Sequence, residues 1–491
     1  MPMKNLSKSK YCSGMQCHKL LWLNVNQPER AAETDAAKQK LFDTGHLVGE
    51  WAQKRFPKGV LIAQDHTDLT GAIADTVKAA AKNSVPAIFE ATVSVHNTLC
   101  RADILERING KIWDLHEVKM SASVKPEHID DCAVQAFCFE EVGYDIRKVF
   151  LMHIDSSYVR KGDIDPHKLF IDEDVTAEVR DRLPKVKKNI NAFLKIINSK
   201  ICPEIEAIDQ CCKPYKCGFY ECCHEALPPY CVEELPRGAK KAATLRALGI
   251  EKICDIPDDF ELTTIQKASF TANKTRKPVI NAPAIKTCLA DLLKPYFYFD
   301  FETVFPAIPA FDNSRPYQQI PFQFSLHKYD GKTIAHHEFL SGKRTDPRLE
   351  LVESMLNLLG TRGSIIAYNK SFEMNIIKEL ATCFPRYKKQ LEALLPRFWD
   401  LMTPFRSAHY VHRDFHGSHS IKYVLPVLVP DLSYKTLEIQ EGGTASMQYE
   451  LFLMGTINDK EWKKTATDLR EYCRMDTLAM VRILEKLDGL A

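Results

Sequence analysis

Two carboxylates lie two residues apart in an aromatic segment near the middle of the chain, Tyr-Phe-Tyr-Phe-Asp-Phe-Glu at residues 296–302. The aromatic residues predict a buried β-strand. Because side chains on a strand alternate between its two faces, Asp300 and Glu302 are expected to project from the same face. Two like charges on one face of a buried strand lose their hydration and repel each other. A divalent cation between them removes both costs, so the segment predicts a metal site on a β-sheet.

Asp103 and the sequence Glu117-Val118-Lys119 form a second group of this kind, on two strand-like runs. Glu117 and Lys119 are two residues apart and therefore share a face. Metal-dependent hydrolysis of a phosphodiester needs carboxylates that hold the cation and a group that prepares the attacking water. Asp103, Glu117 and Lys119 supply these parts. Two such groups in one chain favour phosphodiester chemistry with Mg²⁺ or Mn²⁺.

The chain has 491 residues, enough for roughly two to four domains. Its 45% hydrophobic and 26% charged residues are typical of a soluble globular protein. The net charge of +2 gives no global indication of nucleic-acid binding, so any basic surface must be local. No signal-peptide core follows the polar N-terminus, and no segment reaches about 18 uncharged apolar residues. We therefore expect a cytoplasmic protein without a membrane partner.

The pattern of short apolar runs predicts an α/β fold in two domains. Up to residue 224, four strand-like runs and a helix over 130–142 indicate an α/β core with a mixed sheet. Residues 225–290 are expected to form a helical linker, either a plain spacer or one similar to helix-hairpin-helix DNA binders. A second α/β domain is expected over 291–491, where a turn at Asp330-Gly331 predicts a β-hairpin. Its strand order is that expected of a ribonuclease-H-like sheet.

Asp103 with Glu117-x-Lys119 resembles the PD-(D/E)xK nuclease superfamily, here without the proline before the aspartate. The sequence His46-x-x-Gly49 on an early helix is similar to the RecB-type subgroup of that superfamily. The resemblance implies a restriction-endonuclease-like fold in which Asp103, Glu117 and His46 bind the metal and Lys119 polarises water.

Gln135 matches the conserved helix glutamine of the same subgroup, although the usual tyrosine four residues later is Phe139. The resemblance assigns Gln135 to the catalytic residues.

Sixteen cysteines in a chain expected in a reducing compartment favour metal binding over a disulfide framework. One remote and three closely spaced cysteines resemble the ligands of iron-sulphur RecB-like nucleases, including the CRISPR-associated adaptation nucleases: Cys17, Cys211, Cys217 and Cys223. The resemblance implies a 4Fe-4S cluster that ties the chain ends of the domain together. Four thiolates also suit Zn²⁺. Other cysteines close by in the sequence leave the ligand set open: Cys12, Cys202, Cys212 and Cys222.

Asp300-Phe-Glu302 resembles the first motif of the DnaQ-like DEDD exonucleases, which use four acidic metal ligands. The second motif is matched by Asn369-Lys-Ser-Phe-Glu373, with glutamate in place of aspartate. Because glutamate is one methylene longer, Asp400 is a candidate substitute ligand.

Tyr472 and Asp476 match the third motif and lie four residues apart on one helical face. The resemblance implies a 3′-5′ exonuclease in which Asp476 binds a metal ion and the Tyr472 phenol orients the attacking water.

Two further segments, 417–424 and 437–443, do not fit the generic exonuclease pattern. In the first, Ser418, His419 and Lys422 are candidates for contact with a substrate strand. With the opening segment 6–17, these stretches resemble a bacterial family of unknown function that fuses the two nuclease modules.

The fusion implies a DNA nuclease that acts on single-stranded or end-bearing DNA with a helicase in trans. It does not distinguish between DNA repair, phage defence and nucleic-acid turnover as the biological role. Two alternatives remain open at this point. One is a nucleic-acid-binding protein whose C-terminal fold is an inactive clamp, and the other is a zinc-stapled scaffold without hydrolytic activity.

Overall fold

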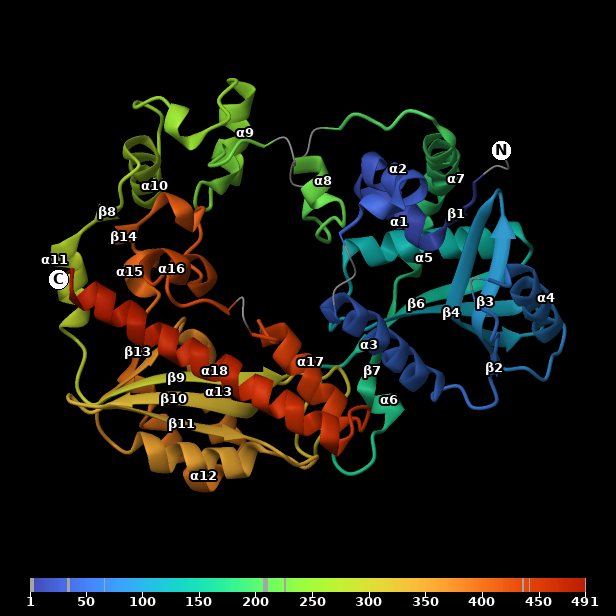
Figure 1. Ribbon diagram of the computed structural model, residues 1–491. Coiled ribbons are helices and arrows are strands. Elements are labelled where there is room, and N and C mark those ends of the chain that lie inside the picture. The colour runs from blue at the N-terminus through green and yellow to red at the C-terminus, as the bar shows by residue number, and fades with distance from the viewer. Residues whose placement is uncertain are drawn as a thin grey trace. The chain divides into compact units, whose positions relative to one another are not determined.

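The computed structural model describes residues 4–32, 36–65, 67–205, 211–224, 227–434, 437–440 and 442–490 (Figure 1). The chain divides into two compact units. Unit 1 comprises Met1–Ala226 with Ala307–Tyr317, and unit 2 comprises Leu227–Pro306 with Gln318–Ala491. The predicted boundary after residue 224 falls at Glu225 and Ala226, which lie outside the described residues. Both units contain helices and mixed sheets, which confirms the α/β class.

Unit 1 is built on a seven-stranded mixed sheet in its described part, with the order β2-β3-β4-β5-β6-β7 and β1 paired with β4. The strands that carry the expected site, β4 and β5, are antiparallel neighbours, and β5 and β6 are parallel. The strands are β1 Leu6–Ser7, β2 Val60–Leu61, β3 Ala87–Val95, β4 Thr98–Asn109, β5 Ile112–Lys119, β6 Asp145–Ile154 and β7 Phe170–Asp174.

The helices of unit 1 cover both faces of this sheet. They are α1 Lys8–Gln16, α2 His18–Asn26, α3 Ala36–Gln53, α4 Leu69–Ala80, α5 Pro126–Glu141, α6 Pro166–Leu169, α7 Thr176–Asn198 and α8 Tyr220–His224. Helix α5 joins β5 to β6 and is buried between the sheet and the helices α1 and α7. It begins at Pro126, earlier than the predicted 130, because proline favours the first turn of a helix, and it ends at Glu141, one residue before the predicted end.

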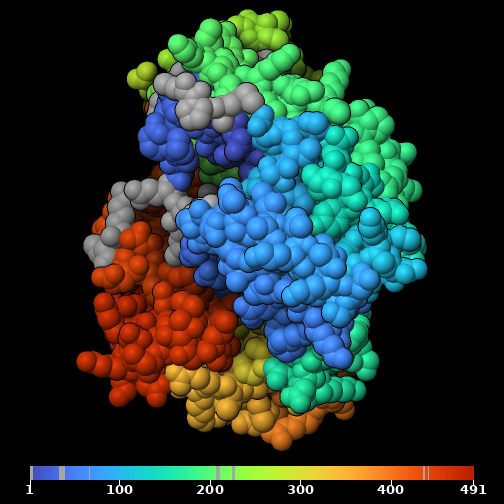
Figure 2. Space-filling model, turned by 90° about the vertical axis from the view of Figure 1, so that its right-hand side faces the viewer, coloured from blue at the N-terminus to red at the C-terminus, as the bar shows by residue number. Residues whose placement is uncertain are grey.

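Helix α3 packs on the other face of the unit 1 sheet, where Val48 and Ala52 join a core cluster with residues from β3, β4 and β6. The segment Ala307–Tyr317 contributes Ala307 to the same cluster. Helix α4 packs against β3 at the edge of the sheet, and this part of the chain (blue) faces the viewer in Figure 2.

Unit 2 is built on a five-stranded sheet in its described part, with the order β11-β10-β9-β12-β13. Strands β9, β10 and β11 are antiparallel, whereas β12 and β13 run parallel to β9. The predicted hairpin turn is confirmed, since Asp330 Oδ1 accepts the N–H groups of Lys332 and Thr333 between β10 and β11. The strands are β9 Tyr296–Val304, β10 Ile320–Tyr329, β11 Ile334–Leu340, β12 Ser364–Ala367 and β13 Phe398–Asp400, with a separate pair β8 Val279–Ile280 and β14 Tyr410–Val411.

Helices lie on both faces of the unit 2 sheet, with α18 across one face and α12 on the other (Figure 1). They are α9 Ala239–Ala247, α10 Thr264–Thr275, α11 Ala282–Leu289, α12 Arg348–Leu359, α13 Ser371–Cys383, α14 Lys388–Glu392, α15 Thr403–Arg406, α16 Ile421–Leu428, α17 Gly442–Leu453 and α18 Asp459–Asp488. None of the helices in the described residues is long and apolar enough to cross a membrane.

Side chains alternate between the two faces of β9, so its phenylalanines and its carboxylates lie on opposite faces. Phe297, Phe299 and Phe301 are buried in a core cluster with α12 and α13. Tyr298, on the opposite face, packs in a second cluster with α16 and α18. Asp300 and Glu302 share the face of Tyr298, so the strand directs both carboxylates toward α18.

Candidate metal centres

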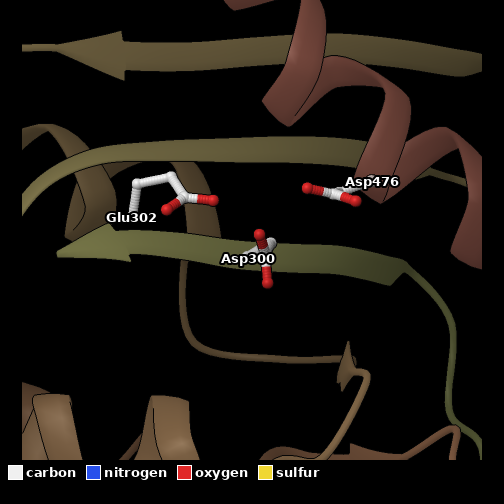
Figure 3. Close-up of side chains that lie close together, drawn as sticks. All are labelled: Asp300, Glu302 and Asp476. Atoms are coloured by element: carbon white, nitrogen blue, oxygen red, sulfur yellow. The ribbon is translucent and has the colours of Figure 1, made fainter. Parts of the chain in front are cut away.

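The carboxylates of Asp300, Glu302 and Asp476 converge in unit 2. One oxygen from each of them lies within 4.8 Å of the other two, and this is the one such group of acidic, histidine or cysteine ligand atoms among the described residues. The first two project from β9 and the third from α18, into one space between the strand and the helix (Figure 3). The pair on β9 and the remote Asp476 therefore meet as the sequence predicts.

Burial and mutual repulsion raise the pKa values of these carboxyl groups. Desolvation raises the pKa of Asp300 well above its ordinary value, and the charges of Asp476, Glu373 and Glu302 raise it further. Glu302 is 7% exposed, and its pKa is raised well above the usual range by desolvation and by the charge of Asp476. Desolvation raises the pKa of Asp476 to about 6. A bound divalent cation relieves this repulsion, and oxygen ligands of this kind suit Mg²⁺ or Mn²⁺.

Two tyrosines hold Asp476 in place. Tyr472, one turn earlier on α18, is buried and lies close enough to lower the pKa of the Asp476 carboxyl. Tyr434 donates a hydrogen bond from its phenol to Asp476 Oδ1 at 2.6 Å. Burial raises the pKa of both phenols well above the ordinary value, so both remain donors. The sequence analysis predicted Tyr472 and missed Tyr434, which stands in a segment without a motif.

Glu373 lies beside the three carboxylates but outside the 4.8 Å group. It is in the first turn of α13, 2% exposed, and its Oε2 has no hydrogen-bond partner among the described residues. Desolvation raises its pKa to about 8, and its charge raises the pKa values of Asp300 and Glu302. A buried carboxylate oxygen without a partner is costly, so Glu373 fits a fourth ligand that closes on a bound cation.

Asp400 has a structural explanation that needs no metal ion. Its Oδ1 accepts the N–H groups of Asn369 at 3.0 Å and Met402 at 3.1 Å, and its Oδ2 accepts a hydrogen bond from Arg406 at 3.0 Å. These contacts fix the loop that carries Asn369 into α13 and thereby position Glu373.

A cavity of about 560 Å³ opens over the carboxylates of unit 2. Aromatic side chains contribute to its wall, including Phe305, Tyr368 and Phe372. Among the described residues that line it, Asp300, Glu302 and Asp476 are the charged ones, and no Lys or Arg is present. The described residues that line it are Asp300, Phe301, Glu302, Thr303, Phe305, Gln319, Tyr368, Asn369, Phe372, Met402, Ser420, Ile421, Gly442, Gly443, Ser446, Tyr472, Asp476 and Met480.

The three predicted residues of unit 1 also come together, on β4 and the end of β5. Asp103 Oδ2 accepts the backbone N–H of Val118 at 2.7 Å, between Glu117 and Lys119. Lys119 Nζ lies 2.5 Å from Glu117 Oε1, and Gln135 on α5 donates from Nε2 to Glu117 Oε2 at 2.7 Å. Glu117 is 1% exposed and Gln135 is fully buried.

Lys8 and Asp131 complete this cluster, and neither was predicted from the sequence. Lys8, at the start of α1, donates to Glu117 Oε1 at 2.9 Å and Oε2 at 3.2 Å. Asp131 on α5 accepts a hydrogen bond from Lys119 at 2.5 Å and lies 3.8 Å from the Lys8 ammonium. Lys8 belongs to the opening segment 6–17, but no motif in that segment indicates a role for this lysine.

The charges in this cluster shift the pKa values of Asp103 and Glu117 in opposite directions. Desolvation and the charge of Glu117 raise the pKa of Asp103 to about 8. Desolvation also acts to raise the pKa of Glu117, but Lys119 and Lys8 lower it below its ordinary value. Glu117 is therefore ionised and paired, whereas Asp103 is a half-buried acid that a bound cation would deprotonate.

Glu90 is a further acid near this cluster that the sequence analysis did not select. On β3 it stands opposite Asp103 with a φ of +57°, a left-handed conformation that interrupts the pairing of β3 with β4. Desolvation raises the pKa of Glu90, and the charges of Arg101, Lys8 and His46 lower it. His46 is exposed on α3 and lies close enough to Glu90 to act on the pKa of its carboxyl group.

The predicted cysteine ligands gather around α2 and α8. Cys17, Cys217 and Cys223 pack with Cys202 and Cys222 against a cluster that contains Leu20 and Phe219. Burial raises the pKa of Cys211 to about 11, with contributions from its neighbours Cys217, Cys223 and Cys17. Among the described residues no three sulphurs lie within 4.8 Å of one another. A tetrahedral Zn²⁺ site would place its sulphurs about 3.8 Å apart.

Comparisons with known proteins report similarity without an assigned activity. A family model described as a domain of unknown function (DUF2779) matches residues 297–420, which include Asp300, Glu302 and Glu373. "Uncharacterized protein MG366 homolog" of Mycoplasma pneumoniae is 27% identical over 227 residues, covering 42% of this chain and 34% of that protein. "Uncharacterized protein MG366" of Mycoplasma genitalium is 29% identical over 215 residues, covering 39% and 32%.

"Uncharacterized protein UU173" of Ureaplasma parvum is 27% identical over 266 residues, covering 50% of this chain and 38% of that protein. The chain thus spans about a third of the length of these curated relatives. No solved structure matches the chain.

Proposed function

We propose that the chain is a metal-dependent nuclease with one hydrolytic centre in each unit. The observation that carries the proposal is the convergence of Asp300, Glu302 and Asp476 within 4.8 Å, from a strand and a helix far apart in sequence. Three acids in one space, one buried and two half-buried, are unfavourable without a cation. A cation held by carboxylates is the usual requirement of phosphodiester hydrolysis.

Unit 2 is proposed to be a DnaQ-like exonuclease with a ribonuclease-H-like sheet. The strand order β11-β10-β9-β12-β13 supports this fold. Asp300, Glu302 and Asp476 would hold divalent cations, with Glu373 as the fourth ligand. Bound cations supply charge stabilisation for the attacking and leaving oxygens. The Tyr472 phenol keeps its proton and orients the attacking water, and Tyr434 fixes one oxygen of Asp476.

Unit 1 is proposed to be a RecB-like nuclease of the PD-(D/E)xK type. The antiparallel pair β4-β5, followed by α5 and the parallel strand β6, supports this fold. Asp103 and Glu117 would hold Mg²⁺ or Mn²⁺, with His46 in the wider metal shell, and Lys119 would polarise the water. Gln135 holds the Glu117 carboxylate in position through its 2.7 Å hydrogen bond.

The cysteines of unit 1 are proposed to hold a 4Fe-4S cluster through Cys17, Cys211, Cys217 and Cys223. Zinc is the alternative, but the sulphurs are more widely spaced than a zinc tetrahedron requires. A cluster spreads its four thiolates over a larger body and suits a wider arrangement. The cysteine ligands would remain reduced in the cytoplasm, which we propose as the location.

The cysteine proposal predicts a coloured protein. Purified without oxygen, the wild type should absorb near about 400 nm and contain about four irons per chain. Cys217→Ser should lose this absorption and most of the iron, and its thermal unfolding temperature should fall because the ligand set no longer closes the loop from residue 17. Cys254→Ser in unit 2 should leave both unchanged. A colourless wild type with stoichiometric zinc would contradict the cluster.

The proposed substrate is single-stranded or end-bearing DNA, with a helicase acting in trans as a possible partner. A 5′-labelled single-stranded oligonucleotide incubated with the full chain and Mn²⁺ should shorten stepwise from its 3′ end. EDTA should stop the reaction, because the carboxylates act only through bound cations. Metal-dependent binding without any shortening would favour the alternative that the C-terminal fold is an inactive clamp.

A further inference from the structure

Helix α17 presents an unusual combination of groups to the cavity of unit 2. Gly442 and Gly443, its first two residues, line the cavity together with Ser446. Ser446 is four residues after Gly442 and three after Gly443, so all three lie on one face of the helix. They belong to, or directly follow, the segment 437–443 that matches no generic exonuclease motif. Glu441 of that segment lies outside the described residues.

Ser446 has a buried hydroxyl group without a partner. The residue is 4% exposed, and its Oγ has no hydrogen bond among the described residues. Buried polar groups are almost always paired, and leaving one unpaired costs about 1–3 kcal/mol. Because Ser446 is one of the residues that line the cavity, a ligand that binds there can supply the missing partner.

The beginning of α17 adds donors beside this hydroxyl. The first N–H groups of a helix have no acceptor within the helix, and the helix dipole makes this end favourable for anions. Gly442 lies against the metal-binding carboxylate, since a Cβ atom at its position would be 3.3 Å from Glu302 Oε2. The donors of α17 are therefore adjacent to the cation site.

The charges around the cavity indicate which ligand group these hydrogen-bond donors can bind. The described residues that line the cavity include no Lys or Arg, and Lys422 on α16 lies close enough to Asp476 to lower the pKa of its carboxyl group. A phosphate that is not on the cations can therefore be bound in the wall of the cavity by the N–H groups and the hydroxyl group of α17. A nucleic-acid strand carries such a phosphate next to the one that is cleaved. We propose that the N-terminus of α17 and Ser446 Oγ bind the phosphate adjacent to the scissile phosphate. This inference rests on the proposed function of unit 2.

The test replaces Ser446 by alanine in the full chain. Because the hydroxyl has no partner among the described residues, Ser446→Ala should not lower the unfolding temperature. Its Kd for a labelled single-stranded oligonucleotide, measured by fluorescence anisotropy with Ca²⁺, should rise about ten- to a hundredfold, as expected for a hydrogen bond to a charged group. In hydrolysis with Mn²⁺ the KM should rise while kcat stays near the wild-type value. The reason is that the contact is equally strong in the bound substrate and in the transition state.

Ser364→Ala is the matched control. Ser364 is a buried serine of unit 2 whose Oγ accepts the N–H of Leu293 at 2.9 Å. Removing this acceptor should lower the unfolding temperature and leave the Kd unchanged. The two variants thus separate a hydroxyl used by the ligand from one used by the fold.

A modified oligonucleotide identifies the phosphate. A neutral methylphosphonate at the linkage adjacent to the 3′-terminal one should weaken binding to the wild type. It should weaken binding to Ser446→Ala much less, because the neutral linkage and the serine substitution each remove the same contact between the phosphate and the hydroxyl group. Independent, additive effects, or wild-type affinity in Ser446→Ala, would overturn the inference while the wild type still degrades DNA. If the wild type binds the strand but degrades nothing, the proposed function fails, and the same Kd comparison still decides the role of Ser446.

Discussion

Asp300→Asn is expected to abolish the 3′-5′ exonuclease activity of unit 2. Asp300 belongs to the three-carboxylate group, and asparagine keeps its shape but removes the charge that holds the cation. A metal ion contributes several kcal/mol to transition-state stabilisation, so a loss of about 4 kcal/mol corresponds to a rate reduction on the order of a thousandfold. The measurement is the rate of 3′-end shortening of a 5′-labelled oligonucleotide with saturating Mn²⁺.

The same variant is expected to stabilise the metal-free protein at alkaline pH. A carboxyl group whose pKa is raised on folding contributes stability below its unfolded pKa, and this stability is lost as the pH rises through the folded pKa. The pKa of Asp300 is raised well above its ordinary value and that of Glu373 to about 8. In EDTA the wild-type unfolding temperature should therefore fall between about pH 5 and pH 8.5. Asp300→Asn should reduce that fall.

Glu471→Gln is the control for Asp300→Asn. Glu471 is exposed on α18, next to Tyr472, and does not line the cavity. Its replacement should change neither the rate nor the pH dependence of unfolding. Activity that disappears in Asp300→Asn together with a lower unfolding temperature at every pH would indicate misfolding and remove support for a metal ligand.

Asp103→Asn is expected to abolish the nuclease activity of unit 1 by a similar factor, on the order of a thousandfold. Desolvation and the charge of Glu117 raise the pKa of Asp103 to about 8, so its carboxyl group is largely neutral in the free protein. Asparagine therefore replaces it without leaving an unpaired charge. Its amide oxygen can still accept the N–H of Val118. The measurement is cleavage of single-stranded DNA in an Asp300→Asn background, where the exonuclease of unit 2 is silent.

Glu106→Gln provides the control in unit 1. Glu106 is on the same strand, β4, but three residues away and therefore on the opposite face, where it contacts His116. Cleavage should persist in this variant. Equal losses of cleavage activity in Asp103→Asn and Glu106→Gln would show that any change of charge on β4 impairs the protein, and would contradict a specific role of Asp103.

Local rules predicted the elements that carry the candidate sites. The alternation of β9 placed Asp300 and Glu302 on one face, and helical spacing placed Tyr472 and Asp476 together. Both sheets are mixed, as the order of apolar runs indicated. These predictions depend on spacings of two and four residues, which the backbone geometry fixes without knowledge of the tertiary fold.

The residues that escaped prediction act across long separations in sequence. Tyr434 reaches Asp476 across 42 residues, and Lys8 reaches Glu117 across 109. Ser446 became a candidate ligand contact only because its hydroxyl group is buried beside a cavity and has no hydrogen-bond partner among the described residues. The segment Ala307–Tyr317 groups with unit 1 although it follows β9 in sequence, through Arg160 contacts to Pro309 and Ala310 among others. No local pattern encodes such contacts.

The central claim is that two sets of acidic side chains each support a separate, metal-dependent cleavage of DNA. Its most direct test is the residual activity of the double variant Asp103→Asn/Asp300→Asn on labelled single-stranded DNA with Mn²⁺, beside the wild type and each single variant. The account predicts that each single variant retains a different pattern of products and that the double variant gives none. A double variant that degrades the strand as the wild type does would contradict the account, because neither set of carboxylates would then be catalytic.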